Sequence, residues 1–250
     1  MVLLIDIGNS NISFGLYDGK NITQTFRLIT KDEKSADEYA MAIKTIMGEK
    51  TLKDAIISSV VPVVTAKIKY MLEKYFSIEP LILGPGVKTG LKLKADEPKS
   101  VGADLISDTV AGCSLYDECL IVDLGTATKF LYGENNTLEG VIIAPGVEIS
   151  TKAMIGNTAL LPNIDLVAPK RVLNNSTIAC MQSGVIYGFA SMVDGMIYHI
   201  RQELKKPNLK VIATGGLSSV IIPYCKTPIH IEKNLILLGL IEIYNKNRNH

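Results

Sequence analysis

Two segments of the chain place an aspartate and a glycine at the end of an apolar run. The first surrounds Asp6 in residues 3–11, and the second surrounds Asp123 in residues 119–128. A glycine in such a turn lets the backbone approach a ligand closely, because it has no Cβ. An aspartate there can hold a cation or its bound water. Neighbouring side chains that could donate to phosphate oxygens are Asn9, Ser10, Asn11, Thr126 and Thr128.

A single Asp-x-Gly sequence is weak evidence, because an aspartate in an ordinary hairpin turn gives the same pattern. The pair is more specific, since each copy follows a run typical of a buried strand and leads into a second strand. The two aspartates are 123 − 6 = 117 residues apart, close to half of the 250-residue chain. A repeat at this distance indicates duplicated lobes. We therefore expect the two turns to bind one polyphosphate, such as ATP, in a cleft between the lobes.

A third glycine-rich turn follows the apolar residues 211–213, where Thr214 precedes Gly215 and Gly216. A strand that ends this way at the start of a helix suits the approach of the adenosine part of a nucleotide. The alternative is a strand-to-helix turn that needs two glycines for its geometry alone. The position of this turn in the second half of a duplicated chain favours the nucleotide.

The elements expected around these turns alternate between strands and helices, which predicts an α/β protein. The repeat places a boundary near residue 115, dividing a lobe at 1–115 from one at 116–250. Strands are expected at 2–7, 12–17, 55–61, 80–83, 119–123, 129–132, 141–143 and 211–214. Helices are expected at 35–47, 62–75, 102–115, 182–204 and from about 234, with a loop at 88–100.

Composition limits the classes of partner. Lys and Arg total 26 against 25 for Asp and Glu, so the charge pattern does not favour nucleic acid or an anionic membrane. The four cysteines lack Cys-x-x-Cys spacing and indicate buried thiols in a reducing compartment. No apolar run has the length of a secretory signal or a membrane span, so we expect a cytoplasmic protein. The three histidines, scattered at 199, 230 and 250, argue against a metal-dependent hydrolase.

Six segments, taken in order, resemble the type III pantothenate kinase family. The resemblance covers nearly the whole chain and implies two actin-like (ribonuclease H-like, ASKHA) lobes. It also implies a homodimer that transfers the γ-phosphate of ATP to pantothenate, the first step of coenzyme A biosynthesis, with Mg²⁺ and a monovalent cation (K⁺ or NH₄⁺). The segments are the first Asp-x-Gly-Asn turn, Gly102-Ala-Asp104, Asp123 to Ala127, Gly140 to Gly146, Thr177 to Gly184, and Ala213 to Gly216.

The resemblance implies a role for each matching residue. Asp104 would be the base that takes the proton from the substrate hydroxyl, as phosphoryl transfer to an alcohol requires. From the residues alone, an N-cap of the following helix explains Asp104 better. Asp123 would hold the monovalent cation, and Asp6 would hold Mg²⁺ through water. The first phosphate loop would be Asp6, Ile7, Gly8, Asn9, Ser10, Asn11, Ile12 and Ser13; Thr126, Gly215 and Gly216 would contact ATP; and Gly102, Ala103, Asp104, Leu105 and Thr177 would bind pantothenate.

The chain departs from the family at three places. Leu105 replaces an arginine that contacts pantothenate, and Ala95 replaces a pocket tyrosine. Lys129 and Leu131 stand where the family has Thr-x-Asp. Lys129 could reach a phosphate, lie near the cation, or face solvent on an edge strand, which is the default.

Two hypotheses remain: a pantothenate kinase with an altered acid-binding pocket, which we favour, and an ATP-binding paralogue with another acceptor or a regulatory role. An apolar stripe between Met181 and Met196 could form the dimer interface or ordinary core.

Overall fold

The computed structural model describes residues 1–248, and the chain divides into two compact units. Unit 1 contains Met1–Ala111 and the segment from Leu235 onward, and unit 2 contains Gly112–Asn234. The chain leaves unit 1 within helix α3 (Ala103–Leu115) and returns to it with helix α7 (Leu235–Arg248). Dividing the chain once at residue 115 does not describe this return.

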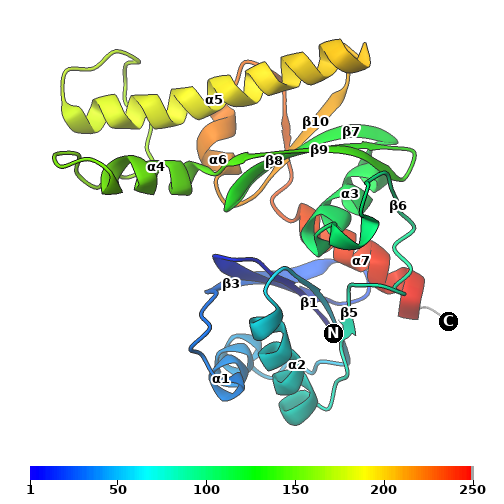
Figure 1. The fold of residues 1–250 in the computed structure, drawn as a ribbon. Coiled ribbons are helices and arrows are strands. Elements are labelled where there is room, and N and C mark those ends of the chain that lie inside the picture. Colours follow the sequence, from blue (N-terminus) through cyan, green and yellow to red (C-terminus); the bar gives the residue numbers. More distant parts are fainter. Residues whose placement is uncertain (249–250) are drawn as a thin grey trace. The chain divides into compact units, whose positions relative to one another are not determined.

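Unit 1 is built on a sheet with the strand order β3-β2-β1-β4-β5 (Figure 1). Its first three strands form an antiparallel meander, and the other two run parallel to β1. The strands are β1 (Val2–Ile7), β2 (Asn11–Tyr17), β3 (Ile22–Ile29), β4 (Asp54–Ser59) and β5 (Leu81–Ile82). Two short elements, β6 (Lys92–Leu93) and the 3₁₀ helix η1 (Pro98–Ser100), interrupt the expected loop at 88–100.

Successive residues of β1 face opposite sides of the sheet. Leu3, Ile5 and Ile7 pack in the cluster that α1 (Ala36–Met47) and α2 (Pro62–Phe76) complete. Leu4 packs on the other face with residues of α7. Asp6 shares the face of Leu4, so its carboxylate lies away from α1 and α2.

Unit 2 repeats this topology, with the strand order β11-β10-β7-β8-β9. An antiparallel meander is again followed by two strands parallel to its first strand. This agreement, together with the second-last position of Asp6 in β1 and of Asp123 in β7, confirms the duplicated α/β fold. The strands are β7 (Glu118–Leu124), β8 (Ala127–Glu134), β9 (Thr137–Pro145), β10 (Lys210–Thr214) and β11 (His230–Ile231).

The core of unit 2 lies between this sheet and α5 (Thr177–Leu204), with contributions from α4 (Val147–Gly156), α6 (Ser218–Ile221) and the 3₁₀ helix η2 (Ile222–Tyr224). Leu120, Val122 and Leu124 face this core, so Asp123 lies on the opposite face of the sheet. In the apolar stripe of α5, Met181, Val185 and Ile186 are buried, which confirms the core alternative for those residues. None of the helices within residues 1–248 is long and apolar enough to cross a membrane.

Candidate functional site

The first Asp-x-Gly turn joins β1 to β2 and is fixed by backbone hydrogen bonds. The Gly8 amide donates to the Asn11 carbonyl at 3.0 Å. Thr30, just after β3, donates its hydroxyl to the Gly8 carbonyl at 2.7 Å and its amide to the Ser10 carbonyl at 3.0 Å. Thr30 therefore supports the turn, although nothing in the Asp-x-Gly pattern indicates it.

The turn presents a short exposed polar segment. Asn9, Ser10 and Asn11 are exposed, whereas the side chains of Ile7 and Ile12 are completely buried. The two isoleucines can therefore contact a ligand only through their backbone. Asp6 is half-buried and accepts a hydrogen bond from the Ser58 hydroxyl at 3.0 Å, so the end of β4 orients its carboxylate.

The second turn is enclosed by three glycines from three different segments. A Cβ on Gly215 would lie 2.5 Å from Oδ1 of Asp123 and 2.6 Å from the Leu124 carbonyl oxygen, and Gly215 has a φ of +88°. A Cβ on Gly125 would lie 3.2 Å from the same Asp123 oxygen. Gly146 packs directly on the Thr126 carbonyl. These close approaches pack the backbone of the second turn against the segments that contain Gly146 and Gly215. The Thr126 side chain is exposed.

Asp123 forms an ion pair with Lys129. Nζ of Lys129 lies 2.7 Å from Oδ2 of Asp123, and the side chains are 13% and 12% exposed. The expectation that Lys129 faces solvent on an edge strand is wrong, because β8 lies between β7 and β9. The expectation that Thr128 offers its hydroxyl to a phosphate is not met either, since Thr128 is fully buried and its Oγ1 has no hydrogen-bond partner.

The start of α3 lies beside the ends of β1 and β4 in unit 1. The position of a Cβ on Gly102 is 3.6 Å from Cγ1 of Val60, and the Val60 amide donates to the Ile7 carbonyl at 3.1 Å. The Asp104 carboxylate folds back against Gly102. Because α3 begins at Ala103, Asp104 lies within its first turn and not at the N-cap.

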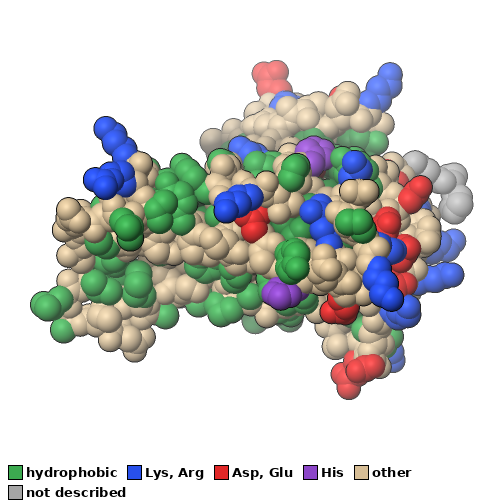
Figure 2. Space-filling model, turned by 90° about the horizontal axis from the view of Figure 1, so that it is seen from above, with side chains coloured by type: hydrophobic (Ala, Val, Ile, Leu, Met, Phe, Trp, Pro, Cys, Tyr) green, Lys and Arg blue, Asp and Glu red, His purple; other side chains and the backbone are tan. Residues whose placement is uncertain are grey.

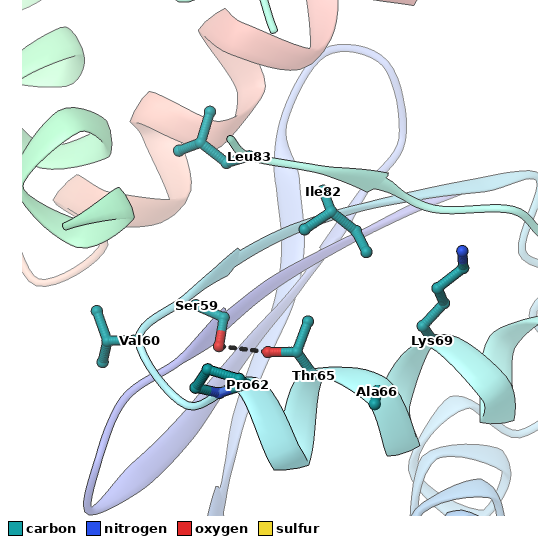
Figure 3. Close-up of a pocket in the computed structure, with 8 residues that line it drawn as sticks. All are labelled: Ser59, Val60, Pro62, Thr65, Ala66, Lys69, Ile82 and Leu83. Atoms are coloured by element: carbon teal, nitrogen blue, oxygen red, sulfur yellow. Dashed lines mark hydrogen bonds between the residues drawn. The ribbon is translucent and has the colours of Figure 1, made fainter. Parts of the chain in front are cut away.

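A cavity of about 410 Å³ opens at the carboxyl end of β4 (Figure 3). Val60 contributes to its wall, so the cavity is next to the start of α3. The hydroxyls of Ser59 and Thr65 are bonded to each other at 2.6 Å, and Lys69 supplies the one ammonium group of the lining. The remaining lining residues are Pro62, Ala66, Ile82 and Leu83.

The remaining residues expected at the site lie at helix ends and turns. Leu105 is half-buried in the first turn of α3, and Ala95 is exposed. Thr177 is exposed as the first residue of α5, whose N-cap Ser176 accepts a hydrogen bond from the Ala179 amide. Unit 1 thus gathers the first turn and the start of α3, and unit 2 gathers the second turn with Gly215.

Comparison with known proteins gives consistent matches along the chain. The family model described as type III pantothenate kinase matches residues 2–199. A protein of Acholeplasma laidlawii described as a type III pantothenate kinase is 46% identical over 247 residues, which cover 99% of both chains. A protein of Exiguobacterium sp. with the same description is 41% identical and covers 99% of this chain and 100% of its own.

Solved structures with low sequence identity show the same fold. A Campylobacter jejuni protein provisionally described as a Baf family transcriptional activator is 21% identical, with a TM-score of 0.60, over 99% of this chain and 100% of its own. A Sinorhizobium meliloti protein provisionally described as a 2-dehydro-3-deoxygalactonokinase is 9% identical, with a TM-score of 0.58, over 100% of both chains. At these identities the likeness extends to the fold alone, a two-lobed actin-like architecture.

Proposed function

The chain belongs to the type III pantothenate kinase family, and from this membership we propose that it transfers the γ-phosphate of ATP to pantothenate, forming 4′-phosphopantothenate for coenzyme A biosynthesis. The observation that carries the proposal is the 46% identity over 99% of both chains to a relative described as that kinase. The alternative, an ATP-binding paralogue without this activity, is not favoured by that match. A cytoplasmic location follows from the same proposal.

Asp104 is proposed as the base of the reaction. An alcohol becomes a better nucleophile when a carboxylate within hydrogen-bond reach accepts its proton. Asp104 suits this role because its carboxylate lies against Gly102, which is next to Val60 at the carboxyl ends of β1 and β4, where ligands of open α/β sheets bind. Gly102, Ala103, Leu105 and Thr177 are proposed to contact pantothenate.

The nucleotide is proposed to bind through both turns. In the first turn the side chains of the exposed Asn9, Ser10 and Asn11 can donate to phosphate oxygens. Gly8, whose amide and carbonyl are bonded to Asn11 and Thr30, is proposed to allow the ligand to approach the backbone closely. In the second turn, the exposed Thr126 side chain can contact the nucleotide, and Gly215 and Gly216 are proposed to contact it through their backbone. Mg²⁺, when bound with ATP, neutralises phosphate charge. The carboxylate of Asp6, oriented by Ser58, is the type of oxygen ligand that suits this ion or its water.

The experiment that tests the proposal measures ADP release from MgATP with and without pantothenate, and identifies the phosphorylated product by mass spectrometry. Pantothenate-dependent ADP release with the mass of 4′-phosphopantothenate is the expected result. Binding of MgATP without any turnover would reject the kinase and support the binding paralogue.

Replacing Leu105 with arginine is expected to lower KM for pantothenate by about 10- to 100-fold, because a charge-assisted hydrogen bond to a carboxylate contributes about 1.5–3 kcal/mol. The value of kcat should change little, since this contact is present in both the ground state and the transition state. Initial rates over a range of pantothenate concentrations measure both constants. Leu105→Met, which keeps an apolar side chain of similar size, is the control; an unchanged or higher KM in Leu105→Arg would contradict the placement of position 105 in the acceptor pocket.

A homodimer is proposed from a stripe of small residues on the outer face of α5. Gly184, Gly188, Ser191, Gly195 and Tyr198 recur at intervals of four and three, and all are exposed or half-buried. A Cβ on any of the three glycines would meet nothing within 4 Å. Because glycine within a helix costs about 1 kcal/mol relative to alanine, these glycines suggest close approach of another helix.

Exposed apolar side chains next to this stripe support the same surface. Figure 2, which views the molecule from the side of α5, shows separate groups of hydrophobic side chains at the surface over the left part of the view, with Lys and Arg side chains protruding among them. Exposed apolar side chains that gather on one surface mark interfaces. The apolar residues exposed at the start of α5 and in the loop before it are Leu160, Val167, Val172, Leu173 and Ile178.

Gly188→Leu is expected to convert the homodimer into a monomer of 27.2 kDa, because the added side chain prevents the close approach of the second helix. Size-exclusion chromatography with light scattering measures the mass. Glu203→Leu, at an exposed position of α5 outside the stripe, should leave the dimer intact. A wild-type mass of 27.2 kDa, or a dimeric Gly188→Leu variant, would rule out this interface.

A further inference from the structure

The Asp123 carboxylate is paired with a cation that belongs to the chain itself. Asp123 and Lys129 are direct cross-strand partners on β7 and β8, so their side chains project from the same face of the sheet. This register brings Nζ of Lys129 to 2.7 Å from Oδ2 of Asp123. Both side chains are largely buried, so the charge of each one needs the opposite charge of the other to offset its loss of hydration.

The other oxygen of Asp123 faces the backbone of the second turn. A Cβ on Gly125 would lie 3.2 Å from Oδ1, and one on Gly215 would lie 2.5 Å from it. One oxygen is therefore in contact with an ammonium group and the other is enclosed by glycines. A monovalent metal ion bound at the same carboxylate would be repelled by the positive charge of Lys129, whose ammonium group already contacts Oδ2. The residues present at Asp123 do not fit a bound monovalent cation.

The residue opposite the aspartate differs in unit 1. Asp6 lies directly across from Ser13 in the pairing of β1 with β2, as Asp123 lies across from Lys129. The duplicated units thus differ at the residue opposite the aspartate, where one has a neutral hydroxyl and the other an ammonium group. The positive charge is a specific property of the second turn and not a consequence of the shared topology.

We propose that the Lys129 ammonium takes the place of a monovalent cation at the second turn, so that the protein binds MgATP and turns over without K⁺ or NH₄⁺. The link to ATP rests on the function proposed above. An ammonium on a side chain carries the same charge as either ion and is held at the carboxylate by the chain, so no free ion has to be bound from solution. The fixed charge would orient Asp123 and offset the negative charge of the phosphates.

The test compares wild type, Lys129→Thr and Lys129→Met in choline chloride and after its replacement by KCl or NH₄Cl at constant ionic strength. The MgATP dissociation constant from calorimetry and the pantothenate-dependent rate are measured for each. Lys152→Ala is the matched control, because Lys152 forms an exposed pair with Glu148 at 3.6 Å outside the second turn. Thermal unfolding of each variant separates loss of the fold from loss of the charge.

Wild type and Lys152→Ala should show the same MgATP affinity and rate in all three salts. In choline chloride, the MgATP affinity and the rate of Lys129→Thr should each fall at least about tenfold. Both should recover with KCl or NH₄Cl, since the removed side chain leaves room for the ion. Lys129→Met should lose as much and not recover, because its side chain fills that room. The proposal would be overturned if K⁺ raised the MgATP affinity or the rate of wild type by about tenfold. It would also be overturned if Lys129→Thr had the affinity and rate of wild type in choline chloride. The effect of each salt on MgATP affinity can be measured even if pantothenate is not the acceptor. The proposal for Lys129 and the proposed pantothenate kinase activity can therefore be rejected independently of each other.

Discussion

Replacing Asp104 with asparagine is expected to lower kcat for pantothenate phosphorylation by about 10²–10⁴-fold, the contribution typical of a general base. Asparagine has nearly the same shape but cannot accept the proton of the attacking hydroxyl. Because Asp104 lies in the first turn of α3 and not at its N-cap, the free energy of unfolding should change by less than about 1 kcal/mol. Steady-state rates and thermal unfolding of the purified variant measure the two effects.

MgATP binding separates this role from a general disturbance of unit 1. The Asp104→Asn variant should bind MgATP as wild type does, since the phosphates are proposed to contact the two turns. Asp37→Asn is the matched control: Asp37 is an exposed carboxylate of α1 that accepts hydrogen bonds from Tyr75 and Lys74. It should retain wild-type kcat. A kcat within about threefold of wild type in Asp104→Asn would remove Asp104 as the base.

Much of the fold could be predicted from local patterns. The apolar run before Asp6 and the pattern from Ser35 to Met47 predict β1 and α1 at nearly their observed bounds, and the capping box of Ser35 and Glu38 explains why the start of α1 is clear. The strand β3 (Ile22–Ile29) and the helix α4 (Val147–Gly156) were not expected. β3 alternates half-buried and exposed residues and has no fully buried one, so its apolar signal is weak.

The sequence predicts the site only at positions where the residue type itself indicates phosphate or cation binding. The aspartates and glycines of both turns carry such a signal. The support of the first turn by Thr30 and the packing of Gly146 on the second depend on contacts between distant segments. The pairing of Lys129 with Asp123 was beyond prediction for a related reason. It follows from the register of two strands, and a shift by one residue would place Lys129 on the other face.

Replacing Gly215 with alanine is expected to lower the free energy of unfolding by about 2–4 kcal/mol and to weaken MgATP binding by at least about tenfold. The φ of +88° is unfavourable for any residue with a Cβ, and that Cβ would lie 2.6 Å from the Leu124 carbonyl oxygen. The contact is with backbone, so no side-chain rotation can relieve it. The Leu124 carbonyl also accepts from the Leu217 amide at 3.2 Å, a bond that the displaced turn would lose. Chemical denaturation and calorimetry measure the two quantities.

Two further glycines separate the causes of this effect. Gly19 has a φ of +104° with nothing within 4 Å of a Cβ, so Gly19→Ala should show the conformational cost alone, about 1 kcal/mol. Gly140 has open space, so Gly140→Ala should change stability by less than about 0.5 kcal/mol. If Gly215→Ala lowers the free energy of unfolding by no more than Gly19→Ala does, the close approach of Gly215 to Leu124 and Asp123 contributes nothing to stability. If Gly215→Ala lowers the free energy of unfolding by more than Gly19→Ala does but leaves MgATP binding unchanged, Gly215 contributes to the packing of unit 2 and not to nucleotide binding. The Thr-Gly-Gly turn would then need its glycines for the strand-to-helix geometry alone.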